Sequence, residues 1–207
     1  MLPRLPFRLP RPASAGALAP ALAATLVGAL SACGDDSNAF LGVASSETAL
    51  VSFVVFPLSG DPSLPAAVDL SGRRAVRPTI LGGTVLNFDL AFDLDAQGRI
   101  LLIPPARLAS PPSGTSRVGL QTRDESFDGL TRAPDSGYRF DSPTVVTRGQ
   151  TLAIEASAAT CSSTYPMHAK LVVDSVGAVA AGRPIYMRVR VNPNCGFRSL
   201  EPGLPKS

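Results

Sequence analysis

The sequence predicts a mainly β fold, either a single β-sandwich or a partly open barrel, behind a helical N-terminal segment. Two segments, residues 86–95 and 184–191, alternate apolar and polar side chains with the period of two that is typical of strands. After residue 33, no long segment repeats its apolar side chains with the helical period. Gly- and Pro-rich turns separate about eight or nine strand-like runs, which together are long enough for one hydrophobic core.

Residues 1–32 have the three parts of a secretory leader. The first part carries Arg4, Arg8 and Arg11 and no acidic residue, and an apolar stretch interrupted by one proline covers residues 15–30. This stretch is shorter than the roughly 20 residues that a membrane-spanning helix needs. We therefore expect a helical leader that is cleaved rather than a permanent span.

The leader ends in Leu30-Ser31-Ala32-Cys33, which resembles the lipobox of the type II signal peptide of bacterial lipoproteins. The resemblance implies that Cys33 is the lipidation site, that it carries more than one acyl chain, and that the lipid bilayer is the first partner. Gly34 rather than Asp follows this cysteine, which in the lipoprotein sorting pattern implies no inner-membrane retention. The expected location is the cell envelope and, in an organism with two membranes, the outer membrane, facing the periplasm or the surface. A plain secretory signal is the alternative, but it does not need a cysteine at the cut.

Four regions follow from this division of the chain. Residues 1–32 are the signal peptide, and residues 33–47, which are small and polar, form a lipidated tether. Residues 48–199 are predicted to form the sandwich domain, and residues 200–207 a loose tail. A split of the domain into two small sandwiches near residues 133–137 is the alternative.

The N-terminal half of the domain contains four strand candidates. Residues 48–58 are rich in β-branched and aromatic side chains on both faces, which predicts a central strand. Residues 66–70 form a short strand between two turns. Residues 86–95 and 100–103 form a hairpin around the turn at residues 95–98, and the alternation in 86–95 predicts one buried and one solvated face.

The C-terminal half begins with a strand at residues 118–122 and a helical turn at 126–130. Further strands are predicted at 145–146, 152–154, 169–174 and 184–191. In the last of these, four apolar side chains point inward: Ile185, Met187, Val189 and Val191.

The segments from Val146 to Leu152 and from Val179 to Ile185 share a pattern in which a valine precedes a Gly-centred turn and an apolar strand follows. Both segments resemble the first strands of bacterial immunoglobulin-like domains. The resemblance implies an immunoglobulin-like arrangement of the sandwich.

The charge balance argues against a nucleic-acid partner. Of the 19 basic and 16 acidic residues, the three in the leader are all arginines, so 16 of each remain in residues 33–207. Nucleic-acid binding rests on a basic face that neutralises phosphates, and a chain of zero net charge gives no sign of one.

Two cysteines besides Cys33 remain, Cys161 and Cys195. In an exported protein such a pair predicts a disulfide. Metal binding by the pair would need two further ligands, and His168 is the only histidine in the chain.

The sequence indicates no catalytic residue and no cofactor. His168, expected in a loop, would have to serve any Ser-His-Asp triad, and no Gly-x-Ser-x-Gly motif holds a serine for it. No phosphate-binding glycine loop is present either. We therefore expect a protein that is not an enzyme.

Asp93, Asp95, Gln97 and Gly98 resemble the first half of an EF-hand calcium loop. The position of the bidentate glutamate is occupied by Pro104, and the flanking segments alternate as strands. A plain hairpin turn is therefore favoured over a metal site. A calcium-stabilised adhesion module and an envelope hydrolase that uses the carboxylates of residues 86–103 remain alternatives.

Tyr186, Arg188 and Arg190 point outward on one strand and form a candidate binding face for an anionic partner. A second basic group is Arg73, Arg74 and Arg77. Taken together, the sequence predicts a membrane-anchored envelope lipoprotein that acts as a non-enzymatic binding or structural module. Its expected partners are the bilayer and another envelope protein.

Overall fold

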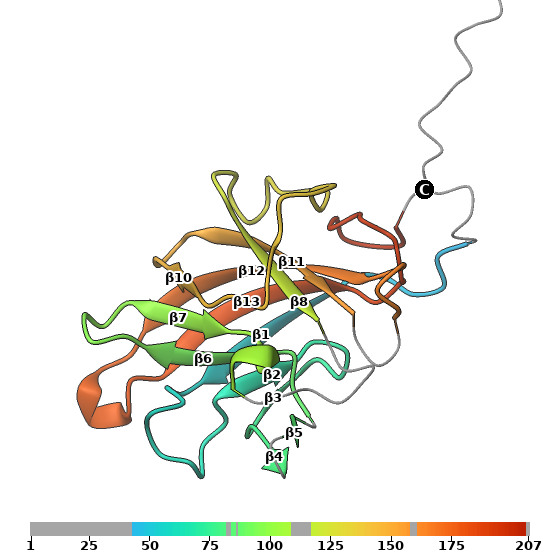
Figure 1. Cartoon of the computed structure of the whole chain (residues 1–207). Coiled ribbons are helices and arrows are strands. Elements are labelled where there is room, and N and C mark those ends of the chain that lie inside the picture. The colour runs from blue at the N-terminus through green and yellow to red at the C-terminus, as the bar shows by residue number, and fades with distance from the viewer. Residues whose placement is uncertain (1–42, 82–83, 86, 109–116, 158–160, 206–207) are drawn as a thin grey trace, which may run out of the picture. The chain divides into compact units, whose positions relative to one another are not determined.

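The computed structural model describes residues 43–205 except 82–83, 86, 109–116 and 158–160. The leader, Cys33 and the loop predicted at 109–116 lie outside the described residues. The described part is mainly β, and two antiparallel sheets pack against each other (Figure 1). The predicted β-sandwich is confirmed. No helix that the structure describes is long and apolar enough to cross a membrane.

Six antiparallel strands form the larger sheet, in the order β1-β13-β12-β11-β8-β9. Their bounds are Ala49–Val55 (β1), Ile185–Asn192 (β13), Met167–Val176 (β12), Thr151–Ala156 (β11), Val118–Arg123 (β8) and Arg139–Phe140 (β9). The register of β1 on β13 is continuous from Ala49, opposite Val191, to Val55, opposite Ile185. Because β1 pairs with no other strand of this sheet, it forms one edge.

The smaller sheet has five antiparallel strands, in the order β10-β7-β6-β2-β3. Their bounds are Thr144–Val146 (β10), Ile100–Ile103 (β7), Leu90–Leu94 (β6), Ala67–Asp69 (β2) and Arg74–Val76 (β3). A separate two-stranded hairpin joins Ile80–Leu81 (β4) to Thr84–Val85 (β5), and two short 3-10 turns cover Pro105–Arg107 (η1) and Val179–Ala181 (η2).

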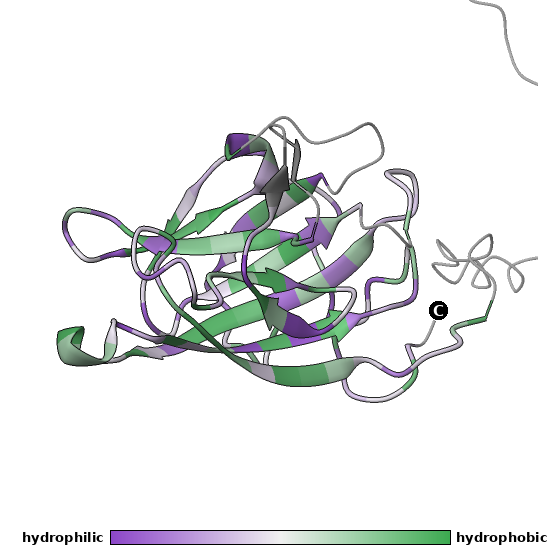
Figure 2. Cartoon of the chain, turned by 90° about the horizontal axis from the view of Figure 1, so that it is seen from below, coloured by the Kyte–Doolittle hydropathy of each residue, from purple (hydrophilic) through white to green (hydrophobic). Residues whose placement is uncertain are grey.

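The main core lies between the sheets because alternate side chains of each strand point into it. Both sheets contribute large buried side chains to one cluster, among them Phe53, Phe92, Leu120, Leu171 and Met187. Hydrophobic and hydrophilic bands accordingly alternate along the strands in Figure 2. In β13 the four predicted inward residues are fully buried, as the alternation of residues 184–191 required.

The opposite faces of the sheets are partly buried as well. On the five-stranded sheet, Ala67, Ala91 and Ile103 form a second cluster with Phe88, and Leu58 and Leu108 pack against it. The prediction that residues 86–95 expose one face was therefore wrong, since Asp89 and Ala91 are buried. Covering segments from distant parts of the chain bury this face, and the local alternation carries no sign of them. The predicted hairpin itself is confirmed, because β6 pairs with β7 around the turn.

Two further expectations are corrected by the structure. Residues 48–58 were expected to form a central strand, but β1 is an edge strand whose outer apolar residues remain exposed. The tail was expected to be loose from residue 200, but Leu200 is fully buried and Gly203 bridges to Thr48. The end of the tether is also fixed, since the amide nitrogens of Ser45 and Ser46 donate to the Asn194 side chain.

Candidate functional site

The predicted disulfide between Cys161 and Cys195 is present, with the two Cα atoms 5.3 Å apart. Cys161 lies in the connection from β11 to β12, and Cys195 follows β13. The bond therefore ties together two connections at the same end of the six-stranded sheet. Structural disulfides of this kind form in oxidising compartments, which indicates an extracytoplasmic location.

Half of the outer face of the six-stranded sheet is covered by two segments, residues 126–133 and 197–203, which we call the cover. Backbone hydrogen bonds join the two segments, from Ala133 to Arg198 (2.8 Å) and from Leu200 to Thr131 (2.7 Å). Leu130, Ala133 and Leu200 pack on Ala153 of β11. The helical turn predicted at 126–130 is part of this cover, and Leu130 N closes it on Ser126 O at 3.0 Å.

Lys170 of β12 is 2% exposed beneath the cover. Its ammonium donates to the carbonyl of Leu130 at 2.8 Å and lies 4.8 Å from the centre of the Phe127 ring. Burial, and then the charge of Arg190, lower the pKa of this side chain. The carbonyl and the ring offset part of the cost of removing the ammonium from water.

His168 lies in β12 and not in a loop, so its predicted position was wrong. Its ring is 3% exposed, Nδ1 donates to the carbonyl of Phe197 at 3.1 Å, and Nε2 is 3.9 Å from a Glu155 oxygen. Burial is the main reason why the pKa of His168 falls to about 4, and Arg132 lowers it further. The histidine is therefore neutral at pH 7 and joins the cover to the sheet.

The other part of this face, along β1 and the first part of β13, is called the open half. The cover reaches its margin, where the centre of the Phe127 ring lies 5.1 Å from the Arg188 guanidinium and the Asn192 side chain donates to the carbonyls of Phe197 and Ser199. Three apolar or aromatic side chains are exposed there: Leu50 (50%), Val54 (41%) and Tyr186 (42%). Val54 lies directly opposite Tyr186, and Leu50 lies opposite Arg190. The structure thus places Tyr186, Arg188 and Arg190 on one face, as predicted, and adds two residues from the neighbouring strand.

The two arginines of the open half have different surroundings. Arg188 forms a bidentate ion pair with Asp174, with nitrogen–oxygen distances of 2.9 and 3.1 Å. Arg190 donates a long hydrogen bond to the Thr48 hydroxyl at 3.4 Å and has no ion pair with another described residue. Arg190 is therefore the cation that remains available to a carboxylate from outside.

Asp93 and Asp95, the weak metal candidates, bind protein donors. Asp93 accepts hydrogen bonds from Ser59 and from the Leu94 amide. Asp95 accepts from the amides of Gln97 and Arg99, and the Arg99 guanidinium pairs with it at 2.6 Å. The Asp95 bonds close the hairpin turn, and the Ser59–Asp93 bond joins β6 to the connection after β1. No group of three or more metal-binding side chains occurs in the part of the chain that the structure describes.

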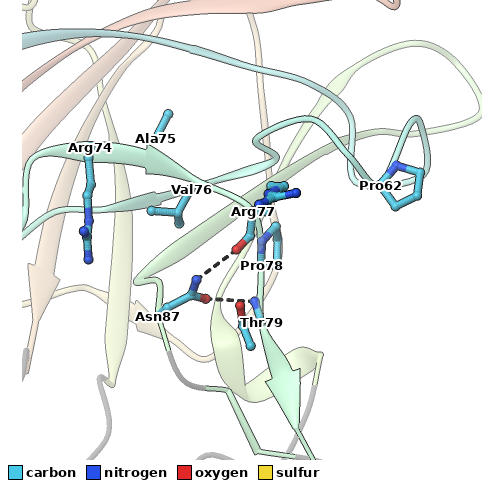
Figure 3. Close-up of a pocket in the computed structure, with 8 residues that line it drawn as sticks. All are labelled: Pro62, Arg74, Ala75, Val76, Arg77, Pro78, Thr79 and Asn87. Carbon is cyan, nitrogen blue, oxygen red and sulfur yellow. Dashed lines mark hydrogen bonds between the residues drawn. The ribbon is translucent and has the colours of Figure 1, made fainter.

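A hollow of about 570 Å³ lies beside β3, lined by the Arg74 and Arg77 side chains, Pro62 and Asn87 (Figure 3). The Asn87 side chain holds the 77–79 segment, bonding Arg77 O at 2.9 Å and Thr79 N at 2.8 Å. Arg74 pairs with Asp69, and its side chain is 66% exposed. Because water screens such exposed charges, we expect this hollow to have a lower affinity for an anion than a site with a buried cation.

Leu50 and Val54 are the residues of the site that sequence reasoning missed. Their signal was present, since the segment from Thr48 to Phe56 contains no charged residue and is apolar on both faces. That pattern is shared by central strands and by edge strands with an exposed apolar face, and only the pairing of β1 decides between them.

A scan against protein-family models finds no match to this chain, and a search of the curated proteins finds no relative.

Proposed function

We propose that this protein is a lipid-anchored, extracytoplasmic binding module that docks another envelope protein on the open half of its six-stranded sheet. One observation carries the proposal: Leu50, Val54 and Tyr186 remain exposed together on a face whose other half the chain itself covers. A clustered apolar surface rimmed by charge is typical of a protein interaction site, whereas single exposed apolar residues are ordinary.

The anchoring part of the proposal rests on Leu30-Ser31-Ala32-Cys33. In it, Cys33 carries the lipid, and residues 34–47 connect the bilayer to β1. The Cys161–Cys195 bond supports the same compartment. Changing Cys33 to Ala is expected to move the protein from the membrane fraction to the soluble fraction and to abolish incorporation of labelled palmitate. A Cys33→Ala chain that still takes up palmitate would exclude this anchor.

The docking part is tested by a photoreactive benzophenone amino acid at Tyr186 of the full chain, in the cells that make it. Val145 of β10 is the matched control position, because it is 39% exposed against 42% for Tyr186. We expect a discrete adduct from position 186 and none from position 145. Equal adducts from both positions, or none from either, would reject the open half as the docking surface.

A further inference from the structure

The backbone of β1 has an edge that is open between two closed points. At one end the Thr48 amide donates to the carbonyl of Gly203 at 2.9 Å, and at the other the Phe56 amide donates to the carbonyl of Pro65 at 2.8 Å. Both bonds point away from β13, because Gly203 and Pro65 lie outside that strand. Successive residues of an antiparallel strand direct their backbone groups to alternate sides. Every second residue between Thr48 and Phe56 therefore faces this edge.

The residues that face the edge are Leu50, Ser52 and Val54. None of the backbone hydrogen bonds that join described residues outside the strand ladders involves their amide or carbonyl groups. Their side chains are also the exposed ones of β1, since the intervening Val51 and Phe53 point toward the core. Three amide groups and three carbonyls that have no partner among the described residues, and two exposed apolar side chains, thus lie along one line.

Proteins commonly protect a free edge with charged residues, proline or a bulge. The seven residues of β1, ALVSFVV, contain none of these, and the register on β13 is unbroken. The open stretch of about five residues is about 17 Å long at the usual rise per residue. We propose that this edge binds an extended segment of the partner protein as a seventh strand of the sheet, which rests on the proposed docking function.

The occupant is an extended peptide of another protein rather than a second copy of this chain. Two copies paired antiparallel about Ser52 would bring Phe56 of one copy opposite Thr48 of the other. Those positions are already closed by Pro65 and Gly203, so two further segments would have to fit between the strands. A single short strand meets only one set of these two closures, and β3, which also contacts β1, contributes Ala75 to the main core.

The charges beside the edge indicate the chemistry of this segment. β1 is uncharged, but Arg190 lies across from Leu50 and has no ion pair with any residue that the structure describes. Lys170, opposite Arg190 on its other side, is held by the cover through the Leu130 carbonyl. We expect the segment to carry apolar side chains toward Leu50 and Val54 and a carboxylate within reach of Arg190.

The test places the benzophenone amino acid at Val54 of the full chain and varies Ser52. Ser52→Pro removes an amide proton that bonds no residue the structure describes and that an added strand needs, whereas Ser52→Ala keeps it. We expect the adduct to persist with alanine and to fall at least tenfold with proline. Thermal melting of each variant shows whether the fold is retained. If proline unfolds the protein, Ser52→Lys replaces it, because lysine blocks strand addition without constraining the backbone.

Two charge-reversal variants test whether the partner segment places a carboxylate near Arg190. Arg190→Glu is expected to reduce the Val54 adduct severalfold, whereas Arg148→Glu, an exposed change in the turn before β11, leaves it unchanged. Protease digestion of the adduct is expected to identify a partner segment that contains an acidic residue. Equal effects of the two reversals would contradict the carboxylate.

Failure of this inference is distinguishable from failure of the docking function. An adduct that persists in folded Ser52→Pro and Ser52→Lys proteins would show that the partner contacts side chains only, and the docking function would stand. A disulfide-linked dimer of Ser52→Cys, absent from Val145→Cys, would make a second copy the occupant and overturn the inference. No adduct from Val54 or from Tyr186 would reject both proposals.

Discussion

The covered half and the open half of the six-stranded sheet are built on neighbouring strands, and they differ in what lies above them. Under the cover, the polar side chains of His168 and Lys170 are almost fully buried and bonded to backbone carbonyls. Along β1 and β13, the apolar side chains of Leu50 and Val54 are exposed instead. Polar side chains are thus buried in the covered half, whereas apolar side chains are exposed in the open half.

This difference separates residues that stabilise the domain from residues that are available for binding. A buried polar group contributes only if its partners stay in place, so the covered half tolerates little change. An exposed apolar group contributes little to folding, and under the proposed docking function it contacts the partner. We expect the contrast to appear in stability, most strongly at the disulfide and least at the buried histidine.

The largest effect is expected from the disulfide that fixes the connections next to the cover. Cys161 and Cys195 are 34 residues apart in the sequence. In the chain-entropy model, a loop of this length removes about 4 kcal/mol of denatured-state freedom. Replacing both cysteines by alanine should therefore lower the free energy of unfolding by about 4 kcal/mol, measured by chemical denaturation.

Reduction provides the control for this change. Dithiothreitol should lower the melting temperature of the original protein and leave that of the double alanine variant unchanged. A melting temperature that reduction does not alter would show that the disulfide does not stabilise the fold. The covered end of the sheet would then be stabilised by packing alone.

A matched pair of leucines compares the halves directly. Leu200 of the cover is fully buried, whereas Leu50 of the open half is 50% exposed. Leu200→Ala should destabilise the protein by about 3 kcal/mol, because it leaves a cavity on Ala153. Leu50→Ala should cost less than about 0.5 kcal/mol. Similar losses for the two variants in urea unfolding would contradict the division of the sheet face.

The pH dependence of stability probes the buried histidine. The pKa of His168 is about 4 in the folded protein, below the usual value of 6.5, so the unfolded chain binds the proton first. The stabilising effect is complete above pH 6.5 and is lost as the pH falls toward 4. Between pH 7 and pH 5, this loss amounts to about 2 kcal/mol.

His168→Gln keeps a polar side chain but cannot titrate, and it serves as the comparison. The original protein should lose about 2 kcal/mol more stability than this variant between pH 7 and pH 5. Burial raises the pKa of Glu155, which works in the opposite direction, but Glu155 is present in both proteins and its effect cancels. Parallel stability curves for the two proteins would show that the His168 ring is open to water.

The sheets of this fold were accessible from the sequence because period-two alternation is a local property. It predicted the buried residues of β13 and the hairpin of β6 and β7, and the cysteine pair predicted the disulfide. The cover was not accessible in the same way. Leu200 lies beyond the last strand, and its burial depends on pairing with Thr131, far away in the sequence.

The candidate site was predicted in part. Tyr186 and Arg190 were found from the outward positions of their own strand. Leu50 and Val54 were missed because an apolar segment shows how well it suits a sheet but not whether it has one neighbouring strand or two. His168 was placed in a loop because the proline and the serines before it resemble a turn, whereas pairing with Glu155 and Asn192 makes it part of β12.

The central claim is that β1 has a free edge in the isolated protein, and residue-resolved amide hydrogen exchange tests it most directly. Val51 and Phe53 face β13 and should be protected, whereas Leu50, Ser52 and Val54 should exchange rapidly. The predicted result is therefore an alternation of period two along β1, beside uniform protection of the central residues of β12. Uniform protection from Ala49 to Val55 would contradict the account, because the edge would then already be paired.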